Sequence, residues 1–555
     1  MRSFSTRTAP VVFALVLIAF AFSVGVRTTW DLTWPGQNWV GIGIDLYRDI
    51  ASAQTMKDTG YGPDPTYLDE KTWYNPMIPG ITAVTSAVLD LPVNVVSTRI
   101  GAYLNVLAPL GFLLLCAKLF DRWTACYATA AFLFLTSGPL PSFVSATYSP
   151  WFIPVNFVQA VFYPAVLVLW KAHRSGRVGW YLAAGAAWGL VFLGHTGPAL
   201  ILGGMNCMWL VSLAWAVWRE PNAARKARRR EELKRGAVRF GLMAAVAIVV
   251  SAPFVMIIAG HYGLRIKNPI PSNYSYALLS RGLPRLIVIH LTIPMAIALV
   301  GLVRLRMRRS HRTARLLVMS WVATCALFLA YSFVRLGAQQ VAGIALPSIV
   351  PSFHFLFYLK AATAVLFGVG LRVISKWAWK LWRRERAFRA AAGTPIAVAI
   401  CVLLLIPAVL QYPFRSDFTV ERTDALKVPG SPEVQAFEFL RNRVGPRDVV
   451  VAADRDGATV VTPTGAKVVA IYDGFSNPYV DLNSRIAARD GMVASLASGD
   501  VAAFRTLASQ YGVTWVVLRP PAAFDEGPAW QGTIHLAASA GPLRIYRVAA
   551  NQNAH

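Results

Sequence analysis

Eleven apolar stretches of about 20 residues dominate the 555-residue chain. About 20 apolar residues in a helix are needed to cross the hydrocarbon core of a bilayer, so each stretch predicts a membrane span. Only 15% of the residues are charged, against about 25% in soluble proteins. We therefore expect a polytopic α-helical membrane protein whose spans lie near 10–28, 99–118, 123–140, 150–171, 179–196, 198–218, 238–259, 285–304, 315–334, 353–374 and 394–411.

The basic residues indicate how the chain is oriented. Alternate junctions between the stretches hold 29 Lys and Arg residues but five acidic ones, which accounts for most of the net charge of +27. Such segments stay on the cytoplasmic side. We expect a multi-pass protein of the plasma (inner) membrane with a cytoplasmic N-terminus and an extracytoplasmic C-terminus. Because the charge is scattered over short loops, it does not indicate nucleic-acid binding.

The first apolar stretch and the cysteines bear on two questions, whether the N-terminal segment is cleaved and whether disulfides form outside the membrane. The stretch resembles a signal peptide, but no small-residue cleavage site follows Ser23, so we interpret it as a retained anchor. All five cysteines lie in or next to predicted spans. A disulfide framework outside the membrane is therefore excluded, and an external metal ion would need oxygen or imidazole ligands. The sequence requires no cofactor, and dependence on a divalent cation is left open.

The tail after residue 411 has the composition of a soluble domain. Strand-like runs at 448–453, 467–472, 513–518 and 543–548 alternate with helical patterns at 432–443 and 500–511. We predict a transmembrane catalytic domain over 1–411 and an extracytoplasmic α/β accessory domain over 412–555.

Acidic residues are rare outside the tail, and on the outward side they all lie in the first loop, about residues 30–98. Ile42–Met56 has helical spacing, and Asp45 and Asp49 lie four residues apart on one face. Arg48 is expected to face elsewhere, by about 100°. A solvated helix on the membrane surface explains the pattern as well. The pair is nevertheless the best candidate for acid–base chemistry.

Outward histidines and cations form the second group of candidates. His195 and His354 lie at outward ends of predicted spans, where ionisable groups usually face a cavity or a partner. An anionic phosphate would need cations, since Arg and Lys supply charge-assisted hydrogen bonds. The candidates are Arg265, Lys267, Arg335 and Lys360, which in the alternative interpretation bind ordinary lipid headgroups.

The retained first span, the first-loop segment Gly43–Asp49, the element Tyr74-Asn75-Pro76 and the outward α/β tail together resemble the GT-C superfamily of polyprenyl-phosphate-sugar glycosyltransferases. Within that superfamily, Trp73–Pro109 and Phe475–Arg489 are similar to the actinobacterial arabinofuranosyltransferases of the galactan-priming type. The resemblance implies a role in cell wall biogenesis.

The resemblance also implies a mechanism. A sugar leaves a polyprenyl-phosphate donor and passes to the hydroxyl group of a glycan or lipid acceptor with inversion, on the outer face. Asp45 matches the catalytic acid of the family's first loop and would be the base, with Asp49 as a helper or a metal ligand. Many relatives carry a further acid in a later outward loop, whereas the later membrane loops of this chain have none. Either Asp69 or Glu70 would then substitute for it, or the metal-dependent version of the mechanism does not apply. We expect the donor or acceptor to contact Asp69, Glu70, Lys71, Tyr74, His195 and His354.

Three alternatives remain open. A transporter or flippase of a lipid-linked substrate would usually show internal repeats and mid-span acids, neither of which is evident. A glycan ligase or polymerase would work at the same face, and the sequence separates it poorly from a single-sugar transferase. The third alternative is a structural or sensor protein with a glycan-binding tail.

Overall fold

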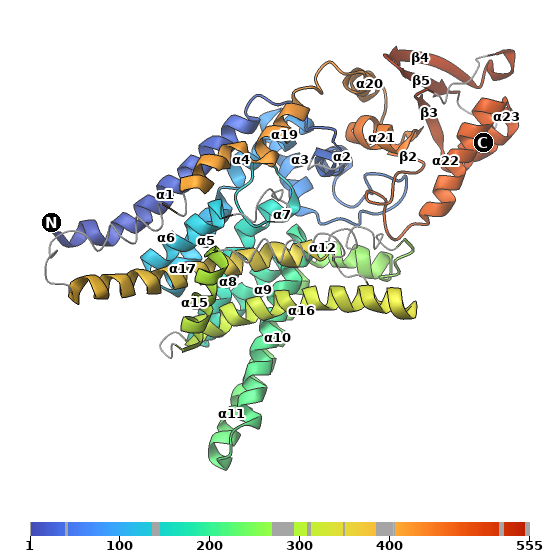
Figure 1. The fold of residues 1–555 in the computed structure, drawn as a ribbon. Helices are drawn as coiled ribbons and strands as arrows, with labels where there is room; N and C mark the ends of the chain where they lie inside the picture. Colours follow the sequence, from blue (N-terminus) through green and yellow to red (C-terminus); the bar gives the residue numbers. More distant parts are fainter. Residues whose placement is uncertain are drawn as a thin grey trace. The chain divides into compact units, whose positions relative to one another are not determined.

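The computed structural model describes residues 2–38, 43–135, 145–268, 293–307, 312–347, 350–384, 403, 406–520 and 527–549 (Figure 1). It divides into two compact units. Unit 1 comprises Met1–Thr28, Gly101–Ala252 and Ser272–Thr419, and unit 2 comprises Thr29–Ile100, Pro253–Pro271 and Val420–His555. The predicted outward loop and most of the predicted tail thus share a unit, although the predicted boundary at residue 411 stays a prediction.

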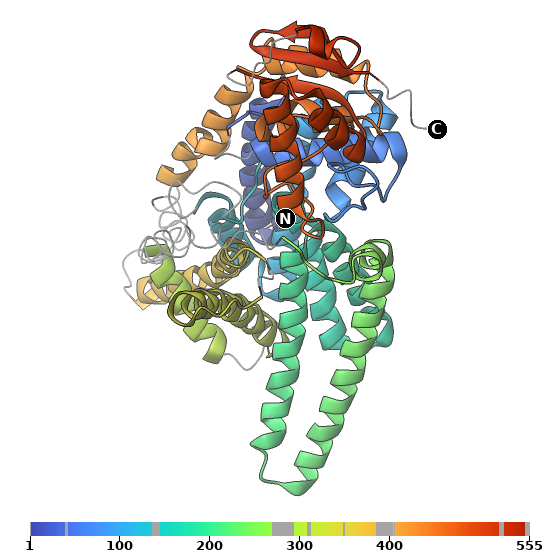
Figure 2. The same ribbon diagram turned by 90° about the vertical axis from the view of Figure 1, so that its right-hand side faces the viewer.

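The regular elements among the described residues of unit 1 are all helices. Its elements are α1 (Arg2–Thr29), α5 (Leu107–Leu119), α6 (Arg122–Phe134), α7 (Pro154–Phe157), α8 (Gln159–Ser175), α9 (Val178–Gly194), α10 (Thr196–Trp218), α11 (Ala223–Val250), α15 (Ile293–Met307), α16 (Arg312–Ala342), α17 (Phe353–Arg384) and the 3₁₀ turn η3 (Tyr412–Phe414). Two further helices, α4 (Val93–Leu104) and α19 (Ser416–Ala425), are divided between the units and lie mostly in unit 2. Figure 2 shows α10 and α11 as a long antiparallel hairpin.

Six described helices are long and apolar enough to cross a membrane, and a broken pair, Ala223–Val250 and Ala252–His261, makes a seventh if it is one span. The break follows from Pro253, which cannot donate a backbone hydrogen bond and clashes with the preceding turn. The protein is therefore a multi-pass membrane protein. The count of eleven spans stays a prediction, because α6 and α15 adjoin undescribed residues and most of the run 394–411 lies outside the described residues. The six helices are Thr8–Thr29, Val93–Leu119, Pro154–Ser175, Thr196–Trp218, Arg312–Ala342 and Phe353–Trp377.

Glycines allow two helix pairs in unit 1 to pack backbone against backbone. A Cβ atom on Gly301 of α15 would lie 1.9 Å from the carbonyl oxygen of Leu366 in α17, and one on Gly370 would lie 1.9 Å from that of Ile297. Gly185 and Gly189 of α9 meet the backbone of α11 in the same way. Small residues at such crossings supply the close packing that stabilises helices in lipid, where the hydrophobic effect does not drive their association.

Unit 2 carries a five-stranded mixed sheet of order β2-β1-β3-β5-β4. The strands β2, β1 and β3 pair in parallel, whereas β5 pairs antiparallel with β3 and β4. Four of the strands match predicted runs, and β4 was not predicted. The strands are β1 (Val449–Val451), β2 (Lys467–Val468), β3 (Val513–Leu518), β4 (Ile534–Ala540) and β5 (Leu543–Val548).

The helices of unit 2 include the first-loop segments. The helical pattern at 42–56 is confirmed by α2 (Gly43–Thr59), and α3 (Met77–Leu89) follows the Tyr-Asn-Pro element. The tail supplies α20 and α23 as predicted, together with α22, which was not predicted. The remaining bounds are α12 (Ala252–Val255), the π-helix η1 (Met256–His261), α20 (Pro432–Arg441), α21 (Asp454–Asp456), η4 (Gly457–Val461), η5 (Thr462–Thr464), α22 (Leu482–Ser498), α23 (Val501–Tyr511) and η6 (Pro528–Trp530).

The first loop and the tail share one hydrophobic core. Tyr47 of α2 stacks on Trp34, and the Trp34 ring meets Phe437 of α20 edge-on at 4.7 Å between centroids. Ile44, Tyr47 and Tyr67 are buried together with valines of the tail's sheet and of η4. Helix α2 is therefore not a solvated helix, since most of its side chains are buried.

We predict that Gly370→Leu lowers the thermal unfolding temperature of the purified protein, because a side chain there cannot fit against Ile297 and overpacking costs about 1–3 kcal/mol. The matched control is Gly337→Leu in α16, where no described atom lies within 4 Å of an added Cβ. Equal unfolding temperatures for the two variants would contradict this packing.

Candidate active site

The first two turns of α2 bring three charged side chains of the first loop together. Arg48 donates from Nη1 to Oδ1 of Asp45 at 3.2 Å, and its Nη2 and Nε both lie 3.1 Å from Oδ1 of Asp49. The guanidinium group thus lies between the two carboxylates. The expectation that Arg48 faces elsewhere is wrong, because the long, flexible arginine side chain reaches back along the helix to Asp45 and sideways to Asp49.

The three groups differ strongly in exposure. The side chain of Asp45 is 44% exposed, that of Arg48 is 13% exposed, and that of Asp49 is 2% exposed. Only Asp45 can therefore meet an incoming molecule directly. The buried carboxylate of Asp49 holds the guanidinium group of Arg48 by an ion pair. The guanidinium group in turn orients the carboxylate of Asp45.

Burial shapes the electrostatics of this cluster. Loss of hydration raises the pKa of Asp49 to about 6, although the charge of Arg48 opposes that rise and the charge of Asp45 adds to it. The pKa of Arg48 is raised despite its burial, because Asp49 and Asp45 favour the charged form. The second oxygen of Asp49, Oδ2, is buried and accepts no hydrogen bond from any described residue.

Aromatic rings from two distant segments enclose the guanidinium group. Its carbon lies 4.1 Å from the ring centroid of Tyr74 and 5.7 Å from that of Phe475 in the tail. The faces of aromatic rings attract a cation, and the rings also exclude water from it. Trp73 packs edge-on against Tyr74 at 5.3 Å between centroids. The tail thus contributes directly to the surroundings of the first-loop charges.

A second polar network links the first loop to the tail around the buried Asp64. Its Oδ1 accepts backbone N–H groups of Thr66 and Tyr67 at 2.7 and 2.9 Å, and its Oδ2 accepts Nδ2 of Asn477 at 2.9 Å. Burial raises the pKa of Asp64 to about 6. Asn477 also donates to the carbonyl oxygen of Lys71 at 3.0 Å.

Tyr262 completes this network from a third segment. Its hydroxyl group donates to the carbonyl oxygen of Lys71 at 2.7 Å and contacts Oε2 of Glu70 at 3.3 Å. Its ring stacks on Tyr479 at 4.6 Å between centroids. The network holds the turn at Lys71, which leads to Tyr74. It thereby positions the ring of Tyr74 against the guanidinium group of Arg48.

The other first-loop candidates belong to unit 2, as do the candidate cations Arg265 and Lys267. Asp69 forms an exposed ion pair with Arg447 at 3.3 Å. Glu70 lies 3.9 Å from the guanidinium group of Arg485. Lys71 takes part in the network through its backbone, and its side chain is exposed. Arg265 and Lys267 are exposed, and the backbone of Lys267 donates to the carbonyl oxygen of Pro478 at 2.8 Å.

The remaining candidates belong to unit 1. His195 caps α10 by accepting the Gly197 N–H at 2.9 Å, and its ring lies 4.5 Å from that of His354, centroid to centroid. Lys360 is buried and donates to the carbonyl oxygens of Phe132 and Ala146. Arg335 is half-buried on α16. The two bonds of Lys360 use two of the three N–H donors of its ammonium group, which leaves one for a phosphate.

The described residues do not fit a metal centre. Among them, no three His, Cys, Asp or Glu side chains are grouped so that they could hold an ion. Asp45 and Asp49 instead share a guanidinium group, which occupies the space between their carboxylates.

Sequence reasoning missed several residues that build this site. Arg48, Asp64, Tyr262, Phe475 and Asn477 were not selected as site residues. The spacing of three between Asp45 and Arg48 was the signal for the ion pair, since such residues are neighbours on a helix. The sequence Asp64-Pro65-Thr66 indicates a side-chain-capped turn, but no local pattern connects it with Tyr262 or Asn477.

The fold was compared with solved structures. ArnT from Cupriavidus metallidurans, solved with undecaprenyl phosphate, matches 98% of this chain over 100% of its own length with a TM-score of 0.56 and 15% identity. The GT-C resemblance is confirmed for the fold. The Archaeoglobus fulgidus oligosaccharyltransferase matches 93% of this chain over 70% of its own length, with a TM-score of 0.56 and 12% identity.

A variant of the mycobacterial arabinofuranosyltransferase AftD matches 99% of this chain with a TM-score of 0.50 and 14% identity, but this chain spans 42% of its length. No protein-family profile matches the chain, and no curated protein sequence matches it. At these identities the likeness establishes the GT-C fold, and the chemistry has to be argued from the residues.

We predict that Arg48→Gln destabilises the protein by about 3–5 kcal/mol, because it leaves the carboxylate of Asp49 buried without a cation. Arg447→Gln is the matched control, since its ion pair with Asp69 is exposed and such pairs contribute about 0–1 kcal/mol. Unfolding in a denaturant series measures both. Equal unfolding midpoints for the two variants would show that the charge of Arg48 is not needed to compensate the buried carboxylate of Asp49.

Proposed function

We propose that the protein is an inverting glycosyltransferase that moves a sugar from a polyprenyl-phosphate donor to a hydroxyl group of a glycan or lipid acceptor. The observation that carries this proposal is the half-exposed carboxylate of Asp45, held by a buried arginine within a GT-C fold. The similar structures include ArnT bound to undecaprenyl phosphate and an oligosaccharyltransferase complexed with a peptide and a dolichol-phosphate. A lipid phosphate as the leaving group agrees with those ligands.

In the proposed reaction Asp45 acts as the general base. It removes the proton from the acceptor hydroxyl group as the acceptor oxygen forms its bond to the anomeric carbon. The bond between that carbon and the phosphate oxygen breaks on the opposite face, and its electron pair leaves with the lipid phosphate. A carboxylate that is oriented before the acceptor arrives contributes both positioning and base catalysis.

The departing phosphate requires positive charge. Arg265 and Lys267 are exposed, and hydrogen bonds from Lys267 and Asn268 to the carbonyl oxygen of Pro478 hold their segment. We favour these two cations because their side chains are available, whereas Lys360 is engaged with carbonyl groups. Arg335 and Lys360 remain candidates in unit 1. Preorganised cations at a developing phosphate charge lower the barrier without a metal ion.

The proposal includes the finer features expected from the sequence. Tyr74, Asp69, Glu70 and the side chain of Lys71 would contact donor or acceptor beside Asp45, and His195 with His354 would line a substrate path in unit 1. The chain would cross the plasma membrane eleven times, with the first loop and the tail on the outer face. Arabinofuranose is the first sugar to be tested.

Transfer of a whole oligosaccharide is the second candidate, because oligosaccharyltransferase structures match 93% of this chain. The mass of the product separates the two activities. An acceptor that gains one sugar residue supports the proposed transferase, and one that gains a preassembled glycan supports the ligase.

We predict that Asp45→Asn lowers transfer from a polyprenyl-phosphate arabinofuranose at least about 100-fold, the lower range for loss of a general base. The amide keeps the shape of the side chain but cannot accept the proton. Transfer to a radiolabelled acceptor in membranes measures the effect. Asp90→Asn is the matched control, because Asp90 lies exposed in the same loop at the end of α3.

Loss of transfer in Asp45→Asn alone supports the role of the base. Full transfer by Asp45→Asn would overturn it and would favour the ligase or a transporter. Movement of a fluorescent lipid-linked sugar across vesicles that contain the protein then separates the transporter from the ligase.

We predict that kcat/KM falls on the acid side with an apparent pKa near 6, because protonation of Asp49 removes the partner that holds Arg48 in place. Asp49→Asn should lose this acid limb. Since the folded state binds this proton more tightly than the unfolded chain, whose pKa is near 3.8, conformational stability should decrease as the pH rises from 3.8 to 6. An unchanged acid limb in Asp49→Asn would assign it to another group.

A further inference from the structure

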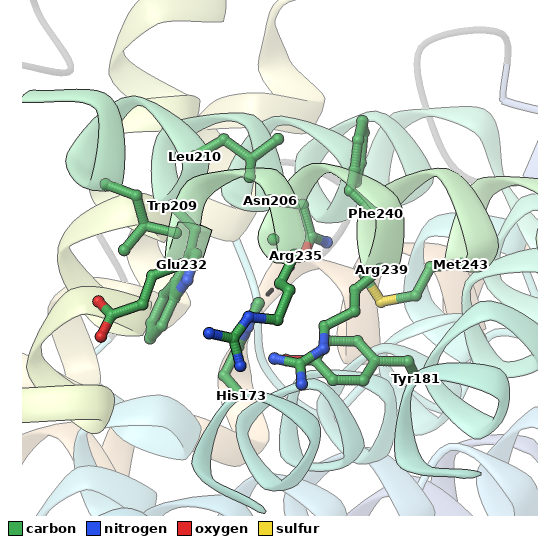
Figure 3. Close-up of a pocket in the computed structure, with 12 residues that line it drawn as sticks. His173, Tyr181, Asn206, Trp209, Leu210, Glu232, Arg235, Arg239, Phe240 and Met243 are labelled. Atoms are coloured by element: carbon green, nitrogen blue, oxygen red, sulfur yellow. Dashed lines mark hydrogen bonds between the residues drawn. The ribbon is translucent and has the colours of Figure 1, made fainter. Parts of the chain in front are cut away.

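A cavity between four helices of unit 1 has no role in the transfer mechanism. It encloses about 210 Å³, far more than the ~10–15 Å³ that one water molecule requires. Figure 3 shows the guanidinium groups of Arg235 and Arg239 beside each other, next to His173 and Tyr181. The lining residues come from α8, α9, α10 and α11.

The cations of the cavity lie on one face of α11. Arg239 is held in place, since it donates to the carbonyl oxygen of Gly176 at 2.9 Å and lies 5.1 Å from the ring centroid of Tyr181. Arg235, one turn earlier, makes an exposed ion pair with Glu231 at 3.5 Å. One cation is thus fixed in the wall and the other can turn toward a ligand.

The single acid that lines the cavity does not cancel this charge. Glu232 lies 3.7 Å from Arg228, which is outside the cavity, and both side chains face solvent. The lining therefore keeps a positive balance of two guanidinium groups against one carboxylate. An anion with several acceptor oxygens suits two neighbouring guanidinium groups.

The same helices carry the signature of a membrane–water boundary at this level. Lys171 lies 3.6 Å above the ring of Trp180, and Arg174 lies 5.1 Å from that of Trp170. His173 and Tyr181, which line the cavity, are neighbours of these residues in the sequence. Tryptophan and basic residues gather where lipid headgroups lie.

The cavity is lined by apolar as well as charged side chains. The apolar residues among the lining are Leu210, Leu213, Phe240 and Met243. The first two lie at the level of Gly236, between Arg235 and Arg239 along α11. A lining that combines two cations with several apolar side chains suits an amphipathic molecule better than a free anion.

We propose that this cavity binds a membrane phospholipid, with its phosphodiester group between Arg235 and Arg239 and its glycerol and acyl portion against the apolar residues of the lining. The positive balance of the lining favours an anionic lipid over a zwitterionic one. The site is separate from the proposed transfer chemistry, since none of its residues takes part in that reaction.

The test uses full-length protein, purified in detergent and stripped of lipid, in native mass spectrometry. The probes are dioleoylphosphatidylglycerol, dioleoylphosphatidylcholine and glycerol 3-phosphate at equal concentrations. The variants are Arg235→Gln and the double variant Arg235→Gln with Arg239→Gln. Arg230→Gln is the matched control, because Arg230 is exposed on the same helix outside the cavity.

We expect phosphatidylglycerol to bind the unmodified protein and Arg230→Gln with at least about 10-fold higher affinity than the double variant, which corresponds to about 1.4 kcal/mol. Arg235→Gln should lie between them, and it keeps the proposal testable if loss of Arg239 unfolds the protein. Equal lipid binding by Arg235→Gln and Arg230→Gln would overturn the site. Binding of glycerol 3-phosphate as tight as that of the lipid would also overturn it, in favour of a soluble anion.

Discussion

The buried ion pair between Arg48 and Asp49 is the interaction on which the candidate site depends. A charged arginine and a carboxylate that are both removed from water are costly unless each compensates the other. Their burial requires that α2 pack against the tail, where Tyr47 and Trp34 join Phe437 in one core. Packing and electrostatics are therefore coupled, because the core that stabilises α2 also excludes water from the pair.

This coupling makes the tail part of the surroundings of the candidate base. Phe475 contributes a ring above Arg48, and Asn477 joins Asp64 in fixing the turn before Tyr74. The rigid surroundings leave Asp45 as the one member of the cluster with substantial exposure. Such an arrangement suits a base that must be oriented before its substrate arrives, because little reorganisation is then needed in the transition state.

Local and non-local features were predictable to very different extents. The length of the apolar runs and the distribution of basic residues indicated a multi-pass helical protein. Helical spacing predicted both ends of α2 to within three residues. The predicted strand at 467–472 shortened to two residues, because only Lys467 and Val468 find a partner strand. Strand β4 was not predicted because it is defined by its pairing with β5 and not by an alternation of apolar and polar residues in its own sequence.

The sequence by itself determined the environment of the chain, because long apolar runs must be buried in lipid. The scarcity of acidic residues before the tail directed the choice of a candidate base to the first loop. Only the tertiary structure decided what surrounds Asp45. The reach of Arg48, the burial of Asp49 and the approach of Phe475 from more than 400 positions along the chain depend on contacts between distant segments. Periodicity reports which face of a helix is apolar, whereas the partner of that face is selected by the packing of the whole unit.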